Sequence, residues 1–403
     1  MMVSPPVVTA VSDIPRKKAL GFVVLLGVVS LLADTTYEGA RSIAGPFLAT
    51  LGASGAVVGI VAGFGELVGY GLRLVSGLLS DRTRRYWAIT LFGYVVNLAA
   101  VPLLALAGRW EIAAALLIAE RVGKAIRTPA RDAMLSHATG RIGAGWSFGL
   151  HEALDQIGAV AGPLIVAAVL HARGSYRAGF ALLLIPALMA IAALLVARAL
   201  YPRPRDLEPA APALESVGFP RAYWLYLGAV GLVAAGYADF PLIAYHFERA
   251  AVVREIWIPV FYAVAMGVDA VAALVFGHLF DRVGVSVLAA VSLLSALFAP
   301  LAFLGGFRLA LLGMALWGVG MGAQESVMRA AVAKMVSADK RGAAYGFFNA
   351  GYGVAWFAGS ALLGALYDVS LGGLVAFSVA AQVVSAPLFL AVKGRLEARV
   401  NAK

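Results

Sequence analysis

The feature that most constrains this chain is a series of apolar runs, each about as long as a membrane-spanning helix. A helix needs about 20 predominantly apolar residues to cross the hydrocarbon core of a bilayer. Runs of this kind, separated by glycine, proline and charged residues, lie near 19–50, 54–79, 86–108, 111–134, 144–170, 177–200, 222–247, 256–280, 285–305, 308–335, 342–366 and 372–392. We therefore predict an all-α membrane protein with twelve transmembrane helices.

The composition argues against a soluble fold. Hydrophobic residues make up 62% of the chain and charged residues 13%, whereas soluble domains are roughly half apolar and about a quarter charged. The absence of cysteine excludes disulfides, iron–sulfur clusters and thiolate metal sites. We find no Walker loop, nucleophile elbow or H-E-x-x-H motif. We therefore expect neither an enzyme nor an ATP-driven pump, and no cofactor.

The distribution of basic residues predicts the topology. They form short groups between apolar runs rather than one basic face, so the net charge of +10 does not indicate a nucleic-acid partner. With the N-terminus inside, the predicted cytoplasmic segments hold nineteen Lys and Arg residues and the opposite side holds six. Because the cytoplasmic side carries the excess of cations, we expect an inner (plasma) membrane protein with both termini cytoplasmic.

The chain is predicted to consist of two similar halves. The only long polar, Pro-rich stretch, 201–221, falls mid-chain and is interpreted as a cytoplasmic linker between bundles at 19–200 and 222–392, with tails at 1–18 and 393–403. Three sets of residues recur at offsets of 200, 197 and 205: Gly77, Asp81 and Arg82 as Gly277, Asp281 and Arg282; Gly145, Gly149 and Gly162 as Gly342, Gly346 and Gly359; Ala33-Asp34 as Ala238-Asp239. Offsets this similar indicate a duplicated six-helix unit.

The segment after the second predicted helix carries a recognisable motif. It reads Gly77-Leu78-Leu79-Ser80-Asp81-Arg82-Thr83-Arg84-Arg85-Tyr86. This resembles the G-x-x-x-D-[RK]-x-G-[RK]-[RK] loop of the major facilitator superfamily, although Arg84 replaces the second glycine and Tyr86 the last basic residue. The resemblance covers nearly the full chain. It implies two six-helix bundles that transport a small molecule by exposing a central site to each side in turn.

The predicted helix 144–170 carries a second motif. Gly149, Gly158 and Gly162-Pro163 match the spacing G-x8-G-x3-G-P, typical of proton-coupled drug exporters in this superfamily, while Val166 and Ala167 occupy the place of its closing glycines. A packing face of small residues is the alternative interpretation. The match favours export by proton antiport.

Charged residues inside predicted helices mark the candidate site. A charge at mid-membrane costs at least about 2.5 kcal/mol, so such residues generally face a cavity and serve function. Asp34, Glu38 and Arg41 are spaced i, i+4, i+7 and share one helix face. Arg41 could neutralise Glu38, but one cation cannot neutralise two acids. A carboxylate whose distance from Arg41 changes between conformations would bind and release a proton.

Two groups of residues extend this site. We predict proton coupling by Asp34 and Glu38, with Asp239 and Asp269 as partners or second carriers that could equally serve packing. Glu66, Tyr70 and Arg73 lie on one stripe of the helix 54–79. An inter-helix bridge is the favoured role for Glu66 and Arg73, with substrate contact as the alternative. The predicted substrate cavity comprises Asp34, Glu38, Arg41, Glu66, Tyr70 and Arg73.

A third group is predicted to form a cytoplasmic gate. Cations near the end of the helix 111–134 should meet acids at the start of the helix 144–170 across the cytoplasmic mouth, where His151 could add pH sensitivity. The spacing of His151, Glu152 and Asp155 could also suit a metal, which we consider the weaker interpretation, and we predict no metal site. The predicted gate comprises Gly77, Asp81, Arg82, Arg85, Arg121, Arg127, Arg131, Glu152, Asp155, Asp281, Arg282 and Arg329.

These patterns together predict a secondary active transporter that exports a small organic or amphipathic compound in exchange for protons. The alternative is a proton symporter or uniporter for a polar or anionic metabolite, which Arg41 and Arg73 would favour if they reach the cavity. A membrane enzyme or non-transporting scaffold would not need duplicated gate motifs. We expect a small-molecule substrate, protons and membrane lipid as partners, and a monomer, because one chain completes the cavity.

Overall fold

The computed structural model describes residues 16–139, 144–202, 219–336 and 341–401, and these are helical with short connections and no strands. The N-terminal half contains α1 (Arg16–Thr50), α2 (Gly55–Thr83), α3 (Tyr86–Leu103), α4 (Trp110–Thr139), α5 (Ala144–Arg173), α6 (Tyr176–Leu182) and α7 (Leu184–Leu200). The C-terminal half contains α8 (Arg221–Gly236), α9 (Phe240–Arg249), α10 (Trp257–Val283), α11 (Ser286–Ser295), α12 (Phe298–Leu304), α13 (Phe307–Ala323), α14 (Arg329–Met335), α15 (Arg341–Val369) and α16 (Leu371–Asn401).

Several of these helices continue one another across a short break. The pairs α6 and α7, α8 and α9, α11 and α12, and α13 and α14 each form one rod, and a π-helical turn at Gln324–Met328 joins the last pair. Counted this way, the described chain has six rods in each half, consistent with the predicted twelve. Nine of the described rods are long and apolar enough to cross a membrane by length and composition alone. The fold is thus an all-α membrane architecture.

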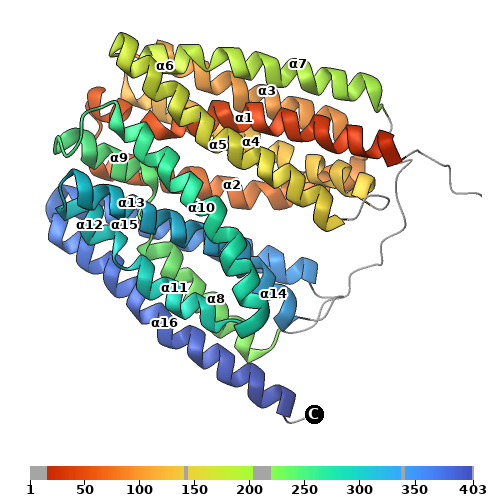
Figure 1. The fold of residues 1–403 in the computed structure, drawn as a ribbon, viewed down its shortest axis with the longest axis vertical. Coiled ribbons are helices and arrows are strands. Elements are labelled where there is room, and N and C mark those ends of the chain that lie inside the picture. The colour runs from red at the N-terminus through yellow and green to blue at the C-terminus, as the bar shows by residue number, and fades with distance from the viewer. Residues whose placement is uncertain (1–15, 140–143, 203–218, 337–340, 402–403) are drawn as a thin grey trace, which may run out of the picture.

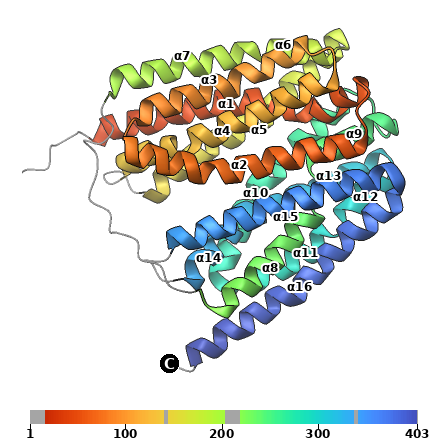
Figure 2. The same cartoon turned by 180° about the vertical axis from the view of Figure 1, so that it is seen from behind.

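The two halves form separate bundles that touch along one end. In Figure 1, α1 to α7 occupy the upper bundle and α8 to α16 the lower one, and Figure 2 shows the same division from behind. The start of α1, the end of α7 and the end of α16 lie at the same end of the molecule. We call this end the terminal face and the other end the opposite face. Most of the predicted linker lies outside the described residues.

The bundles are joined at the opposite face by hydrogen bonds between the halves. The carboxylate of Asp368 in α15 accepts hydrogen bonds from the backbone N–H groups of Gly55, at 2.9 Å, and Ala56, at 2.8 Å, at the start of α2. The hydroxyl of Tyr176 donates to Glu248 at 2.7 Å. These contacts close the opposite face.

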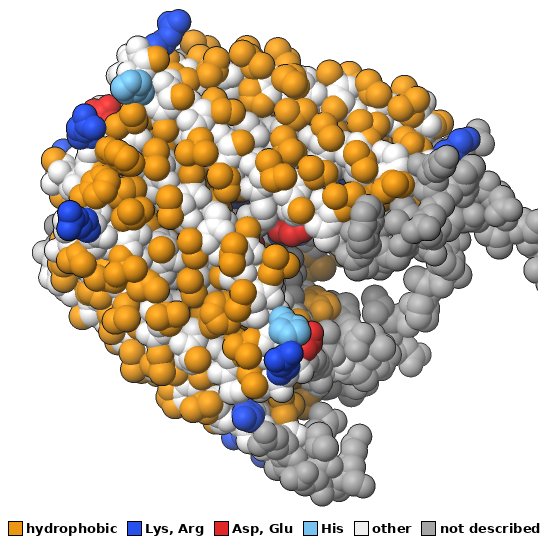
Figure 3. Space-filling view, viewed as in Figure 1, with side chains coloured by type: hydrophobic (Ala, Val, Ile, Leu, Met, Phe, Trp, Pro, Cys, Tyr) orange, Lys and Arg blue, Asp and Glu red, His pale blue; other side chains and the backbone are white. Residues whose placement is uncertain are grey.

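Backbone contacts between the halves also need glycine at this end. A Cβ atom on Gly45 of α1 would lie 1.9 Å from the carbonyl oxygen of Pro241 in α9, and one on Gly59 of α2 would lie 2.3 Å from that of Ser360 in α15. Only glycine allows helix backbones to approach so closely. At the terminal face, the surface is instead hollowed between the bundles, with acidic side chains visible on its walls (Figure 3). The cleft between the halves therefore opens to the terminal face.

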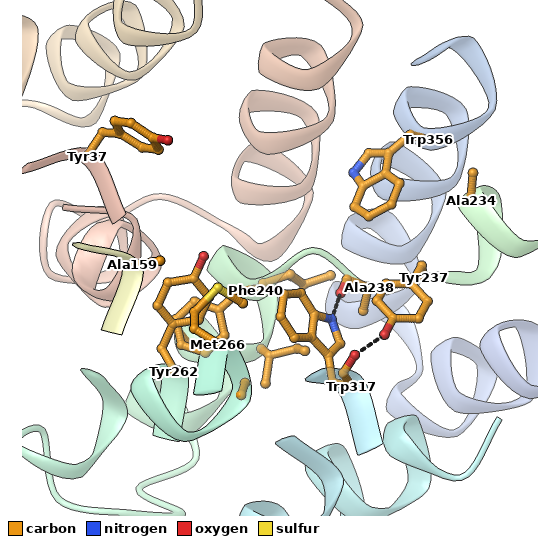
Figure 4. Close-up of a cluster of buried hydrophobic side chains, with 14 of the residues drawn as sticks. Tyr37, Ala159, Ala234, Tyr237, Ala238, Phe240, Tyr262, Met266, Trp317 and Trp356 are labelled. Carbon is orange, nitrogen blue, oxygen red and sulfur yellow. Dashed lines mark hydrogen bonds between the residues drawn. The ribbon is translucent and has the colours of Figure 1, made fainter. Parts of the chain in front are cut away.

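The break between α8 and α9 places an acid in the middle of the protein. Asp239 caps α9, since its side chain accepts a hydrogen bond from the N–H of Phe240 at 2.9 Å. Trp317 of α13 stabilises the break through two hydrogen bonds. Its indole N–H donates to the carbonyl of Ala238 at 2.9 Å, and Tyr237 donates to the Trp317 carbonyl (Figure 4). A discontinuous helix of this kind presents polar groups to a cavity rather than to lipid.

Candidate functional site

A polar cavity lies between the two bundles. Its walls come from α1, α2 and α4 on one side, and from α13, the π-helical turn and α15 on the other. The cavity has a volume of about 130 Å³. The described side chains that line it are Glu38, Arg41, Glu66, Tyr70, Arg73, Arg121, Lys124, Met321, Gln324, Glu325, Phe348, Tyr352 and Trp356. Five of the six predicted cavity residues are among them, and Asp34 is not.

Arg41 joins the two halves through its guanidinium group. Its Nη2 atom lies 2.6 Å from Oδ1 of Asp239 in the C-terminal half and 3.4 Å from Oε1 of Glu66 in its own half. The Asp239 side chain is only 2% exposed, so this ion pair is nearly out of contact with solvent. Removing one partner from a buried ion pair is strongly unfavourable because it leaves the other charge uncompensated. The Arg41–Asp239 pair is therefore a strong link between the halves.

Glu66 forms the inter-helix bridge predicted for it. Its Oε1 atom also lies 3.4 Å from Nη2 of Arg121 in α4. Arg121 in turn lies 3.3 Å from Oε2 of Glu120, whose other carboxylate oxygen accepts a hydrogen bond from Asn97 in α3 at 2.8 Å. Arg121, predicted at the gate, therefore belongs to the central network that connects α1 to α4.

Glu38 contacts both halves, and the alternative in which Arg41 neutralises it is not seen, since Arg41 pairs with Asp239 and Glu66. Its Oε2 atom accepts a hydrogen bond of 2.5 Å from the hydroxyl of Tyr262 in α10. Its Oε1 atom lies 3.8 Å from Nζ of Lys124 in α4, and that ammonium group also lies 3.9 Å from the centre of the Tyr37 ring. Glu38 is therefore held by a neutral donor from one half and a more distant cation from the other.

Asp34 occupies a different environment from the other acids of α1. The residue is 7% exposed, and its Oδ1 atom is buried without a hydrogen-bond partner. It packs against α5, where a Cβ on Gly158 would lie 3.0 Å from the Asp34 Cβ. Arg127, 1% exposed, lies over the Tyr94 ring at 4.2 Å, and its Nε and Nη1 atoms also lack hydrogen-bond partners. Buried polar atoms without partners are rare and commonly mark functional positions.

A chain of polar contacts connects α4 to α5 at the side of the cavity nearer the terminal face. Arg131 donates to the hydroxyl of Ser30 at 2.9 Å, and Ser30 lies 3.2 Å from Nε2 of His151. His151 in turn lies 3.7 Å from a carboxylate oxygen of Asp155. The expected meeting of α4 cations with α5 acids is thus indirect, through α1. Among the described residues, no group of three His, Asp or Glu side chains is arranged to hold a metal.

Asp269 lies where α10 meets α5. Its Oδ2 atom accepts a hydrogen bond from the Gln156 amide at 3.4 Å, and its Oδ1 atom is buried without a partner. This contact joins α5 of one half to α10 of the other. Like Asp34, Asp269 therefore has a buried carboxylate oxygen without a hydrogen-bond partner, but it lies in the other half.

The remaining gate residues lie towards the terminal face. Arg82, Arg85, Asp281 and Arg282 are exposed there, as is Glu152 on α5. Gly77 packs towards Pro129 of α4, with 3.6 Å between Pro129 and a Cβ built on the glycine. The side chains of Asp81 and Arg329 fall outside the described residues. With the cleft open, the gate stays a prediction.

The glycines of the second motif pack α5 against α1. A Cβ on Gly158 would lie 2.3 Å from the Leu31 carbonyl oxygen, and one on Gly162 would lie 2.3 Å from that of Thr35, whereas Gly149 has no neighbour within 4 Å. Pro163 follows inside the same helix. Two of the three glycines therefore allow the close approach of α5 to the helix that carries Asp34 and Glu38.

Several residues of the site were not predicted from the sequence. They are Lys124, Tyr262, Tyr352 and Trp356. Aromatic residues in apolar runs look like core or lipid-facing side chains. Only Lys124, a charge within a predicted span, gave a signal that could have assigned it to the cavity.

Comparison with known proteins places the chain in a family. Its sequence matches the model of the Major Facilitator Superfamily over residues 23–360 and 256–397. The chain belongs to this superfamily. An uncharacterised protein of Mycobacterium tuberculosis (strain ATCC 25618 / H37Rv) is 44% identical over 386 residues, covering 94% of each chain. An uncharacterised MFS-type transporter of Methanocaldococcus jannaschii is 32% identical over 140 residues, 35% of each chain.

Solved structures share the same fold at low sequence identity. A substituted form of the nucleoside transporter NupG superposes with a TM-score of 0.75 at 14% identity, covering 92% of this chain and 99% of that one. A bacterial homologue of the human lysosomal transporter Spinster, inward-facing and unoccupied, superposes with a TM-score of 0.70 at 14% identity, covering 94% and 96%. Family and fold together identify a multi-pass membrane transporter of a small molecule rather than an enzyme.

Proposed function

We propose that this superfamily member is a proton-coupled secondary transporter that exports a small organic or amphipathic compound. In this proposal the two bundles rock about the central cavity and expose it to each side of the membrane in turn. Support comes from the cavity walls, since each bundle contributes one wall and a relative rotation would open or close the space between them.

The observation that carries the proposal is the shared use of Arg41. One guanidinium group holds an acid of its own half, Glu66, and an acid of the other half, Asp239. When the halves rotate, Arg41 moves with Glu66 and away from Asp239. Arg41 can therefore exchange partners, and Asp239 would need a proton or another cation in the second state because an unpaired buried carboxylate is costly.

Besides Asp239, we consider Asp34 and Asp269 as further candidates for carrying the proton. Each is buried, each has one carboxylate oxygen without a hydrogen-bond partner, and one lies in each half. By contrast, Glu38 and Asp239 have short contacts to Tyr262 and Arg41. A carboxylate with fewer contacts that stabilise its charge suits the role of a group that binds a proton in one state and releases it in another.

The direction of opening supports loading from the cytoplasm. The cleft opens to the face at which the chain ends lie, and the excess of Lys and Arg in the sequence assigns that face to the cytoplasm. In this state a compound inside the cell can reach the cavity. Proton-driven export would begin from such a state.

A second candidate function is a proton symporter or uniporter for a polar or anionic metabolite. The observation that favours it is the presence of Arg41 and Arg73 in the cavity lining. Symport and export differ in the direction of accumulation against a proton gradient, and they can be separated by experiment.

The test is flux in proteoliposomes across a compound panel, with and without an imposed pH gradient. Export by antiport predicts that substrate accumulates on the side from which protons flow. Accumulation on the side to which protons flow would establish symport, and flux indifferent to the gradient would remove proton coupling. Asp34→Asn should abolish gradient-driven accumulation while counterflow persists, and Glu111→Gln, an exposed acid at the opposite face, is the control. Full accumulation by Asp34→Asn would rule out Asp34 as the coupling residue.

A further inference from the structure

The two walls of the polar cavity differ in chemistry. The wall from α1, α2 and α4 carries four cationic and two acidic described side chains. The facing wall is largely aromatic, with Phe348, Tyr352 and Trp356 of α15, and its described charged group is Glu325. A ligand that spans the cavity therefore meets charged side chains on one side and ring faces on the other.

Most of the charge on the first wall is committed to internal pairs. Arg41 lies 2.6 Å from an acid, Glu66 has two guanidinium groups at 3.4 Å, and Glu38 accepts the hydroxyl proton of Tyr262. Lys124 differs from these groups. Its ammonium nitrogen is 3.8 Å from Glu38, beyond the 2.7–3.2 Å of an N–H···O hydrogen bond. Since an ammonium group has three N–H donors, Lys124 retains donors for an anionic ligand.

The aromatic wall is ordered by contacts between its rings. Tyr352 lies 5.5 Å from Trp356 and 6.0 Å from Phe348, and its edge meets Tyr70 of the other half at 5.2 Å. The Tyr352 hydroxyl is used internally, since it donates to Gln324 at 2.9 Å. These rings form a fixed apolar surface against which a planar or aliphatic group can pack.

The indole of Trp356 provides a donor without an acceptor. Trp356 is 3% exposed and lines the cavity, yet its Nε1–H has no hydrogen-bond partner. Buried indole N–H groups usually find an acceptor. A ligand with acceptor oxygens would supply one, whereas an ammonium ligand has no acceptor to offer.

We infer that the ligand of this cavity is an amphipathic organic anion, whose anionic oxygens accept from Lys124 and from the Nε1–H of Trp356 and whose apolar part packs against the Tyr352 and Trp356 rings. The inference rests on the proposed transport function and names its substrate class. An organic cation has no acceptor to offer to the Lys124 and Trp356 donors.

The test compares four matched probes that share a carbon skeleton or a charge. Binding of phenylpropionate, phenylpropionamide, phenylpropylamine and propionate to the purified full chain is measured in detergent, where no ion gradient acts. We expect phenylpropionate to bind at least about tenfold more tightly than each of the other three. Tighter binding of the amide or the amine, or no binding of phenylpropionate at millimolar concentration, overturns the inference.

Variants place the ligand in the cavity. Lys124→Gln should weaken phenylpropionate binding about tenfold through loss of a charge-assisted contact, and Lys124→Arg should restore most of it. Trp356→Phe, which keeps a ring but removes the donor, should weaken binding by a smaller factor. Arg173→Gln, an exposed cation at the opposite face, is the matched control. Equal effects of Lys124→Gln and Arg173→Gln would overturn the assignment, and unfolding temperatures check that each variant is folded.

Flux of the same probes separates this inference from the proposed function. Anion-selective binding without flux would refute transport while leaving the ligand class standing. Gradient-driven flux of the amine or the amide but not of phenylpropionate would refute the ligand class while leaving transport standing.

Discussion

The contact between Asp368 and the start of α2 gives the sharpest prediction about the conformational equilibrium. It joins the two halves at the opposite face and exists only while that face is closed. The carboxylate accepts two backbone hydrogen bonds, at 2.9 and 2.8 Å, from N–H groups that have no partner within α2. An acid at a helix N-terminus also interacts favourably with the helix dipole. We therefore expect Asp368→Asn to favour the state in which the opposite face opens.

The magnitude follows from the contacts that are lost. A hydrogen bond to a charged group contributes about 1.5–3 kcal/mol, and a charge at a helix terminus about 0.3–1 kcal/mol. Asparagine keeps one acceptor oxygen, and Asp368 is exposed, so solvent screens part of the charge. A loss of about 1–2 kcal/mol remains, which changes the ratio of the two states by roughly 5–30-fold.

The assay uses the absence of cysteine from the chain. Thr83→Cys with Val283→Cys places two spin labels at the terminal face, one in each half, and Leu106→Cys with Val369→Cys does the same at the opposite face. All four positions are exposed. Pulsed electron paramagnetic resonance should show Asp368→Asn shortening the terminal-face distances and lengthening the opposite-face distances, relative to the unsubstituted residue.

The control is Glu255→Gln, which removes another exposed acid at the opposite face. Unchanged distance distributions in Asp368→Asn, or an equal shift in Glu255→Gln, would show that the Asp368 contact does not hold the opposite face closed. High salt should shift the unsubstituted protein in the same direction as Asp368→Asn, because salt screens exposed charge.

Three further predictions concern the packing of the site. Arg41→Gln leaves the buried Asp239 without its cation and leaves Glu66 with Arg121 alone, and it should lower the free energy of unfolding by about 3–5 kcal/mol, measured as loss of unfolding temperature and denaturant resistance in detergent. Gly59→Ala should disfavour the closed opposite face because its Cβ would lie 2.3 Å from a carbonyl oxygen, whereas Gly69→Ala, with no neighbour within 4 Å, should have no such effect on the label distances. Trp317→Phe removes the indole donor to the break between α8 and α9 and should cost about 1–3 kcal/mol, and equal stability of the variant and the parent would show that this hydrogen bond does not support the break.

The sequence predicted the membrane architecture because the relevant signals are local. Length and hydropathy of a run report whether it can cross a bilayer. The i, i+4, i+7 spacing predicted that Asp34, Glu38 and Arg41 share one face of α1, because helical periodicity fixes which residues share a face. Glu38 and Arg41 line the cavity, and Asp34 does not. The repeat offset likewise pointed to Asp239 as a counterpart of Asp34, although only Asp239 has a salt-bridge partner in the structure.

Partner choice within the site required the tertiary structure. Neutralisation of Glu38 by Arg41, three positions away, was one alternative that the sequence left open, yet Arg41 pairs with Asp239, 198 positions along the chain. Glu38 is held by Tyr262, 224 positions away. Neighbours on one helix can pair only if no better-placed group approaches from another helix, and that depends on how the bundles pack.

The sequence by itself determined that this chain is a helical membrane protein of two related halves with charges buried in its spans. Those properties follow from composition, run length and spacing, which act through short stretches of chain. Only the tertiary structure decided which of those charges face each other across the halves, which buried oxygens lack partners, and which face is closed. These outcomes depend on contacts between residues far apart in sequence, because the low-polarity interior rewards whichever pairing the packed helices bring within a few ångströms.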